Sequence, residues 1–255
     1  MFKLHDIDTN LNAGAVLREA CSEKVSAAMC LCVDWNLSSS SVSLGLSDGS
    51  ISIVNAREAE LQISQSWMAH AYEVWATAFD ICTPQLLYSG SDDCRFSCWD
   101  LRESPSTLVF QNTKSHQMGV CCFAQTPMNS NMLLTGSYDE FLRVWDLRST
   151  LKPVSKYSIS LGGGVWRIKP HPSMPGLVLA ACMHNGFAVV QVGDETAVVA
   201  ESYVKHESLA YGADWQRGEC VEDKTRRESL VATCSFYDRL LRIWKPESLM
   251  AKSGN

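Results

Sequence analysis

Short apolar runs that end in polar turns recur along most of the 255 residues. The run at 86–90 is apolar and ends in small residues, whereas the residues at 143–145 alternate in polarity. Alternation is typical of a half-buried strand, because successive strand side chains point to opposite faces. Asp48-Gly49 and Asn185-Gly186 are strong hairpin signals, since tight hairpin turns need positive φ angles. The pattern predicts an all-β chain.

A histidine, an acid and a tryptophan recur at one fixed spacing. The offsets are 23 and 29 residues in two places, at His70, Asp93 and Trp99 and again at His116, Asp139 and Trp145. A third copy of the turn ends at Trp244. A period of roughly 40–45 residues is the sequence signature of a WD-repeat β-propeller. We interpret the repeated residues as structural, with His116, Ser137, Asp139 and Trp145 expected to form a buried hydrogen-bond chain.

The repeat predicts about five blades. They lie near residues 25–57, 61–102, 107–149, 154–200 and 203–247, with a polar surface loop at 216–229. Residues 1–24 are expected to form an N-terminal segment or a partial blade, and 248–255 a C-terminal tail. Propellers have about 4–8 blades. Two interpretations therefore stay open, a small closed propeller and a shortened chain that forms an incomplete ring.

Composition narrows the function classes. The net charge is −6 and no basic stripe is present, so we expect no nucleic-acid partner. No apolar run reaches about 18 residues, which argues against a membrane span. The N-terminus lacks an apolar signal core, so we expect a cytoplasmic protein. The eleven cysteines have no zinc-type spacing, and we expect reduced thiols, no metal site and no cofactor.

The segments that open the units depart from the repeat. Five positions after the histidine column, the chain has Trp75, Cys121, Trp166 and Tyr211. The repeat does not require an aromatic residue at this position. We therefore expect Trp75, Trp166 and Tyr211 to line an aromatic pocket at one mouth of the propeller, with packing into neighbouring blades as the alternative for each of them.

Other departures fall in the same part of the chain. Gly162-Gly163-Gly164 replaces the histidine turn, so backbone N–H groups can approach a ligand closely. Arg167 lies on an inner strand where repeats usually have small residues. His184, His206 and Asp214 are further candidates. Each has a structural alternative: an exposed turn residue, the repeat's own histidine and a hydrogen-bonded strand end, respectively.

Several segments lie outside the general repeat, at 162–169, 171–172, 179–187, 211–215 and 232–238. With further matches from Trp67 onward, they resemble the diphthine methylesterase family, WD-repeat proteins also called diphthine methyltransferases. The resemblance covers roughly residues 67–244. Family members are longer and have further N-terminal blades, so this chain resembles a shortened member.

The resemblance implies a reaction. It is hydrolysis of the methyl ester of methylated diphthine on translation elongation factor 2, which gives diphthine in diphthamide biosynthesis. The chain is then expected to be a carboxylic ester hydrolase with the elongation factor as its protein substrate. Methylated diphthine carries a trimethylammonium group, and aromatic rings bind such groups by cation–π attraction. Trp75, Trp166 and Tyr211 are the expected cage.

The hydrolytic groups are assigned by elimination. Ester hydrolysis needs an activated nucleophile or water and donors for the oxyanion. We expect no serine nucleophile of the Gly-x-Ser-x-Gly type. His184 or His206 is the expected general base, oriented by Asp214. Arg167 or the amides of 162–164 are expected at the oxyanion.

Two other functions stay open at this stage. Many WD-repeat proteins are non-catalytic scaffolds for protein–protein interaction, for example in endosomal recycling, and a scaffold would release no methanol. A small-molecule methylesterase would accept free esters without the intact factor.

Overall fold

The computed structural model describes residues 1–10, 14–57, 60–103, 106–126, 128–148, 153–217 and 229–249. In these ranges every named element is a strand except the short 3-10 helix η1 (Glu247–Leu249). The fold class is therefore all-β, as the alternating pattern predicts. The chain divides into two compact units, Met1–Asn112 and Thr113–Asn255.

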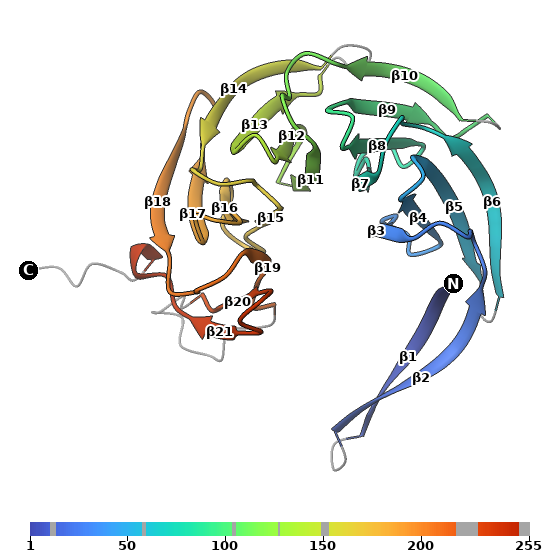
Figure 1. Ribbon diagram of the computed structural model, residues 1–255, viewed down its shortest axis with the longest axis horizontal. Helices are drawn as coiled ribbons and strands as arrows, with labels where there is room; N and C mark the ends of the chain where they lie inside the picture. The colour runs from blue at the N-terminus through green and yellow to red at the C-terminus, as the bar shows by residue number, and fades with distance from the viewer. Residues whose placement is uncertain are drawn as a thin grey trace, which may run out of the picture. The chain divides into compact units, whose positions relative to one another are not determined.

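The first unit has a hairpin and two four-stranded antiparallel sheets (Figure 1). The hairpin pairs β1 (Phe2–Asn10) with β2 (Gly14–Glu23), the first sheet has β3 (Cys30–Trp35), β4 (Ser41–Leu46), β5 (Ser50–Arg57) and β6 (Glu60–Met68), and the second has β7 (Val74–Phe79), β8 (Leu86–Ser91), β9 (Phe96–Asp100) and β10 (Thr107–Asn112). Phe2, Leu4 and Cys21 of the hairpin pack against the core of the first sheet.

The second unit has three sheets in chain order (Figure 1). They contain β11 (Val120–Thr126), β12 (Asn129–Ser137), β13 (Phe141–Asp146) and β14 (Val154–Ser160), then β15 (Arg167–Pro170), β16 (Leu177–Ala181), β17 (Phe187–Val192) and β18 (Ala197–Tyr203), then β19 (Ala210–Trp215), β20 (Val231–Ser235) and β21 (Leu241–Trp244). Each of the five sheets beyond the hairpin is an antiparallel blade, as the repeat predicts, with three described strands in the fifth.

The blade boundaries differ from the predicted ranges by one strand. The range 61–102 assigns β6 to the second blade, but β6 pairs with β5 of the first, with Ile51 opposite Trp67. The same shift applies to β10 and β14, which close the second and third blades. A fixed period shows that a unit repeats, but it does not show which strand of the unit is the first strand of each sheet. Residues 218–228 of the predicted polar loop and 250–255 of the predicted tail lie outside the described ranges.

A buried hydroxyl joins the repeated histidine to the repeated tryptophan. In the third blade His116 Nε2 lies 3.0 Å from Thr135 Oγ1, and Trp145 Nε1 donates to the same oxygen at 2.9 Å. All three side chains are buried. This corrects the expected chain, in which Ser137 is the hydroxyl. Ser137 instead donates to the carbonyl of Met118 at 3.1 Å.

The same network occurs in the second blade. His70 Nε2 lies 2.7 Å from Ser89 Oγ, to which Trp99 Nε1 also donates at 2.7 Å. Asp93 Oδ2 lies 3.0 Å from His70 Nδ1. In the third blade the corresponding acid, Asp139, accepts two 2.8 Å hydrogen bonds from Arg143. The network ties the turn before each first strand to the middle of its sheet.

Removing the shared hydroxyl is expected to destabilise the third blade. Thr135→Val removes the oxygen to which the indole N–H of Trp145 donates and which lies 3.0 Å from His116 Nε2. Removing one partner of a buried hydrogen bond costs about 1–3 kcal/mol, so the free energy of unfolding should fall by about that amount. Urea unfolding followed by tryptophan fluorescence measures it. Thr107→Val, on an exposed strand position, is the matched control, and equal stability of the two variants would refute the role of the network.

Candidate functional site

The first strands of the three blades in the second unit lie side by side. β15 contacts β11 on one side and β19 on the other. We call the end at which these strands begin the proximal end, and the opposite end distal. The turn after β20 is also proximal, because Ala210 pairs with Ser235. The turn after β12 is proximal too, because Val120 pairs with Ser137.

Four aromatic side chains gather at the proximal end. The rings of Trp166 and Tyr211 are 5.2 Å apart and almost perpendicular, at 87°. Phe236 lies 5.8 Å from Tyr211, and Tyr237 lies 5.0 Å from Phe236. We call these four residues the aromatic cluster. Trp166 and Tyr211 are partly buried, whereas Phe236 and Tyr237 are 63% and 74% exposed.

Arg167 places a positive charge beside the aromatic cluster. Its guanidinium carbon lies 5.6 Å from the centre of the Trp166 ring. Nη1 of Arg167 donates to the carbonyls of Cys121 at 3.2 Å and Trp166 at 3.0 Å. These backbone bonds hold the guanidinium in place while the ring of Trp166 attracts its charge.

The three glycines form a loop that packs against the turn after β16. A Cβ on Gly163 would lie 2.1 Å from the carbonyl oxygen of Cys182, and one on Gly164 would lie 2.9 Å from Met183 Sδ. Gly162 has a φ of 74°. Close packing therefore requires glycine here. Among the described residues no hydrogen bond engages the amides of Gly163 and Gly164, and both glycines are buried.

His184 lies in that same turn and is exposed. On one side of it, the amide nitrogen of Ala210, at the start of β19, donates to the carbonyl of Met183 at 2.9 Å. On the other side, Asn185 Nδ2 donates to the carbonyl of Leu161 at 2.7 Å. The turn is therefore fixed between the glycine loop and the strand that carries Tyr211.

His206 has the structural role that was one of its two sequence interpretations. Its Nε2 lies 3.0 Å from Thr233 Oγ1, and its Nδ1 lies 2.6 Å from Ser235 Oγ. Trp244 Nε1 donates to the same Thr233 oxygen at 3.1 Å. This is the network of the second and third blades. Both ring nitrogens are engaged, and burial lowers the pKa of His206.

Asp214 lies away from both histidines. It is three residues beyond Tyr211 along β19, a distance of about 10 Å at strand rise. Its carboxylate lies 3.8 Å from Lys169 Nζ and 4.0 Å from Arg217. Among the described residues no hydrogen bond joins Asp214 to His184 or His206, so the expected orienting pair is not formed.

Trp75 belongs to the first unit. Its Nε1 donates to Asp92 Oδ1 at 3.4 Å. The structure thus brings Trp166, Tyr211 and Arg167 together in the second unit. Trp75 has the corresponding position in the second blade, which belongs to the first unit.

The sequence interpretation missed two aromatic residues and one motif. Phe236 and Tyr237 lie in a segment that carries the family resemblance, but only their contact with Tyr211 assigns them to the cluster. The chain also contains one Gly-x-Ser-x-Gly segment, at 45–49, contrary to the expectation above. It joins two strands, β4 and β5, whereas a nucleophile elbow joins a strand to a helix. Ser47 Oγ accepts a 3.0 Å hydrogen bond from the amide of Met29, which is a structural contact.

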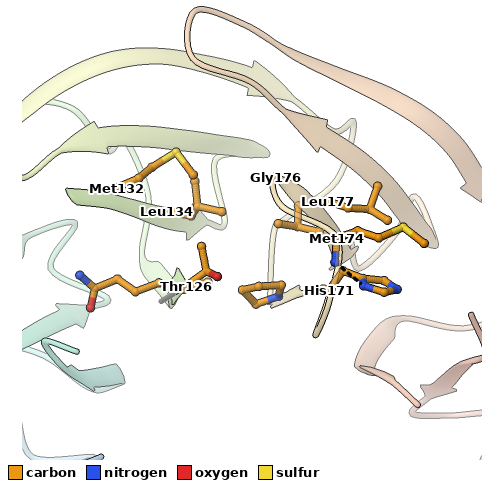
Figure 2. Close-up of a pocket in the computed structure, with 11 residues that line it drawn as sticks. Thr126, Met132, Leu134, His171, Met174, Gly176 and Leu177 are labelled. Atoms are coloured by element: carbon orange, nitrogen blue, oxygen red, sulfur yellow. Dashed lines mark hydrogen bonds between the residues drawn. The ribbon is translucent and has the colours of Figure 1, made fainter. Parts of the chain in front are cut away.

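The distal end has a small pocket between the third and fourth blades (Figure 2). It has a volume of about 10 Å³ and a mostly apolar lining that includes Met132, Leu134 and Leu177. That space suffices for about one water molecule. His171 borders it, with Nδ1 accepting from the amides of Ser173 at 3.1 Å and Met174 at 3.0 Å. We assign the pocket no ligand.

Comparisons with known proteins show which proteins the chain is similar to. Residues 61–100 and 108–146 match the family described as WD domain, G-beta repeat. The chain is 37% identical over 235 residues to the diphthine methyltransferase homolog of Dictyostelium discoideum, covering 85% of this chain and 62% of that protein. It is 43% identical over 168 residues to the diphthine methyltransferase of Mus musculus, covering 64% of this chain and 34% of that protein. The chain is a homologue of proteins named diphthine methyltransferase.

A further homologue of the same name, from Schizosaccharomyces pombe, is 30% identical over 86% of this chain and 65% of its own length. The chain thus spans between about one third and two thirds of these relatives. A solved chain in the crystal structure of the mitotic checkpoint complex gives a TM-score of 0.64 at 17% identity, covering 95% of this chain and 85% of that one. This likeness concerns the fold alone.

In the part of the chain that the structure describes, no group of His, Cys, Asp and Glu side chains is placed to hold a metal ion, and no helix is long and apolar enough to cross a membrane.

The buried histidines predict a loss of stability in mild acid. Burial lowers the pKa of His116 to about 3 and also lowers the pKa values of His171 and His206. An unfolded histidine has a pKa of about 6.5, so the unfolded state takes up protons first as pH falls. The free energy of unfolding should therefore decrease below about pH 7, by about 1 kcal/mol at pH 5.5 from His116 alone.

Urea unfolding between pH 7.5 and 5 tests this prediction, because the carboxylates with lowered pKa values stay ionised throughout that range. A constant free energy of unfolding across the range would contradict it.

Proposed function

We propose that the chain takes part in diphthamide biosynthesis and hydrolyses the methyl ester of methylated diphthine on translation elongation factor 2. Water would add its oxygen to the ester carbonyl, and the products would be diphthine and methanol. The names of the homologues refer to diphthine and to a methyl group. Hydrolysis as the direction of the chemistry is our own assignment.

The observation that carries the proposal is the contact between Trp166, Arg167 and Tyr211. Methylated diphthine has a trimethylammonium group and a methyl ester on one side chain, so the groups that recognise them must lie close together. The aromatic pair offers ring faces to the cation, with rings 5.2 Å apart. The guanidinium, 5.6 Å from the ring of Trp166, offers N–H donors to the ester carbonyl.

The developing negative charge on the carbonyl oxygen would be stabilised by Arg167 and by the amides of the glycine loop. Among the described residues no hydrogen bond engages the amides of Gly163 and Gly164, which lie in the loop that packs against the turn of His184. Donors that are already oriented toward an oxyanion lower the barrier without reorganising. This set requires no metal ion.

His184 is the base in this proposal. It would take a proton from the attacking water and return it to the departing methoxide, so the methyl group leaves as methanol. His206 is no longer proposed for this role, because both of its ring nitrogens hold the fifth blade together. Asp214 is no longer proposed to orient the base, since it lies among Lys169 and Arg217.

Removing the aromatic pair is expected to slow demethylation. Purified protein is incubated with elongation factor 2 that bears methylated diphthine, and intact mass reports the loss of one methylene. Trp166→Ala and Tyr211→Ala should each lower the rate about fivefold or more, because each removes a cation–π contact of about 1 kcal/mol. Tyr72→Ala, an exposed aromatic residue of the first unit, is the matched control and should act like the unsubstituted chain.

An unchanged factor after incubation with well-folded protein would refute the hydrolase and favour a scaffold. Hydrolysis of free methyl esters without the factor would favour a small-molecule esterase.

The role of His184 has its own test. His184→Ala and His184→Gln should lower the demethylation rate about 100-fold or more, the usual contribution of a general base. Because the side chain is exposed, both variants should unfold at the same urea concentration as the unsubstituted chain. Unsubstituted rates in both variants would exclude His184 as the base.

A further inference from the structure

The turn that carries Phe236 and Tyr237 is one residue longer than its counterparts. In the other blades the residues that pair across this turn are six positions apart: Gly45 and Ile51, Gly90 and Phe96, Gly136 and Leu142, and Ala181 and Phe187. In the fifth blade Cys234 pairs with Leu241, seven positions on. Where the third blade has one residue between its serine and aspartate, the fifth has Phe236 and Tyr237.

Hydrogen bonds hold the longer turn in one conformation. Asp238 accepts from Ser235 Oγ at 2.5 Å and from the amide of Glu207 at 3.2 Å. The amide of Phe236 donates to the carbonyl of Leu209 at 3.2 Å, and that of Tyr237 donates to Ser208 Oγ at 2.9 Å. The turn is therefore fixed to the segment between His206 and β19, while both of its rings stay exposed.

Phe236 and Tyr237 are the exposed members of the aromatic cluster and continue it from Tyr211. The rings of Phe236 and Tyr211 meet at 68°, and those of Phe236 and Tyr237 at 89°. Burial raises the pKa of Tyr211, and the nearby phenols of Tyr237 and Tyr138 add to that shift. Fixed aromatic rings in water leave apolar surface unburied, which favours a role in binding over a role in packing.

The cluster suits a cation that cannot donate hydrogen bonds. The carboxylate of the turn, Asp238, is already engaged by Ser235 and by the amides of Glu207 and Leu240. A primary ammonium needs acceptors for its N–H groups, whereas a quaternary ammonium needs only ring faces. We propose that Phe236 and Tyr237 form the outer wall of a quaternary-ammonium site whose inner wall is Trp166 and Tyr211. This inference rests on the function proposed above and adds its specificity-determining residues.

Two small probes of the same shape separate the effect of the positive charge from the effect of size. Glycine betaine methyl ester carries a trimethylammonium group, and methyl 3,3-dimethylbutanoate has a neutral tert-butyl group of the same shape in its place. Titration of each probe with the full chain, followed by ligand-observed NMR, gives the two dissociation constants. We expect the charged probe to bind more tightly than the neutral one.

The wall residues are tested by Phe236→Ser, Tyr237→Ser and the double variant, with Tyr72→Ser as the matched control. Each lost ring should weaken binding of the charged probe about fivefold and leave the neutral probe unchanged. Both side chains are exposed, so the urea midpoints should not move. Equal affinity of the double variant and the unsubstituted chain for the charged probe would overturn the proposal, as would equal affinity of the unsubstituted chain for both probes.

The two proposals fail separately. In one outcome the charged probe binds more tightly than the neutral one, Phe236 and Tyr237 are needed for this difference, and the elongation factor stays methylated. That outcome would refute the hydrolase and support the quaternary-ammonium site. Demethylation at an unchanged rate by the double variant would support the hydrolase and overturn the wall.

Discussion

The buried bond between a histidine, a hydroxyl and a tryptophan is the contact on which each regular blade depends. In the third blade it ties the turn at His116 to Thr135 and Trp145, and so sets where β11 begins. The fourth blade has Leu161 and Val192 in the corresponding columns and cannot form this bond. There the glycine loop packs against the turn after β16, with Gly163 against the carbonyl of Cys182. In the fourth blade, packing of the glycine loop replaces the hydrogen bonds of the histidine. The residues at its proximal end are therefore not required for that network.

The candidate site lies where that specialised blade meets a second departure. Trp166 and Arg167 follow directly from the glycine loop, and Tyr211 begins the next first strand. The fifth blade keeps its network through His206 but has a longer turn, which adds Phe236 beside Tyr211. Thus one blade gives up its structural histidine and the next lengthens a turn. Both changes act at the proximal end, where they leave the apolar core of each sheet intact.

The sequence predicted an all-β chain with about five recognisable blades, because alternation and the repeated columns depend on local residues. It did not identify Thr135 as the shared hydroxyl, since a spacing cannot tell which of two nearby side chains points inward. It grouped Asp214 with the histidines because these residues are close in sequence. Asp214 lies three residues beyond Tyr211 along an extended strand, and this length places it away from the proximal end. The structural role of His206 was harder to predict because the longer turn and the polar loop lengthen the spacing from His206 to Asp238 and Trp244. The hydrogen bonds of the histidine ring are formed all the same. The extra residue beside Phe236 is detectable by counting, but only once the paired positions are known.

The network also decides which histidine is suited to the proposed chemistry. A general base must gain and lose a proton in each cycle, and for His206 this would disturb its bonds to Thr233 and Ser235. Those bonds hold Trp244 and the long turn in place. His184 lies in a turn that is fixed on one side by the backbone bond from Ala210 to Met183 and on the other by the side chain of Asn185. Among the described residues no hydrogen bond ties the His184 ring to a sheet. The proposed base therefore lies in the blade that lacks the structural histidine.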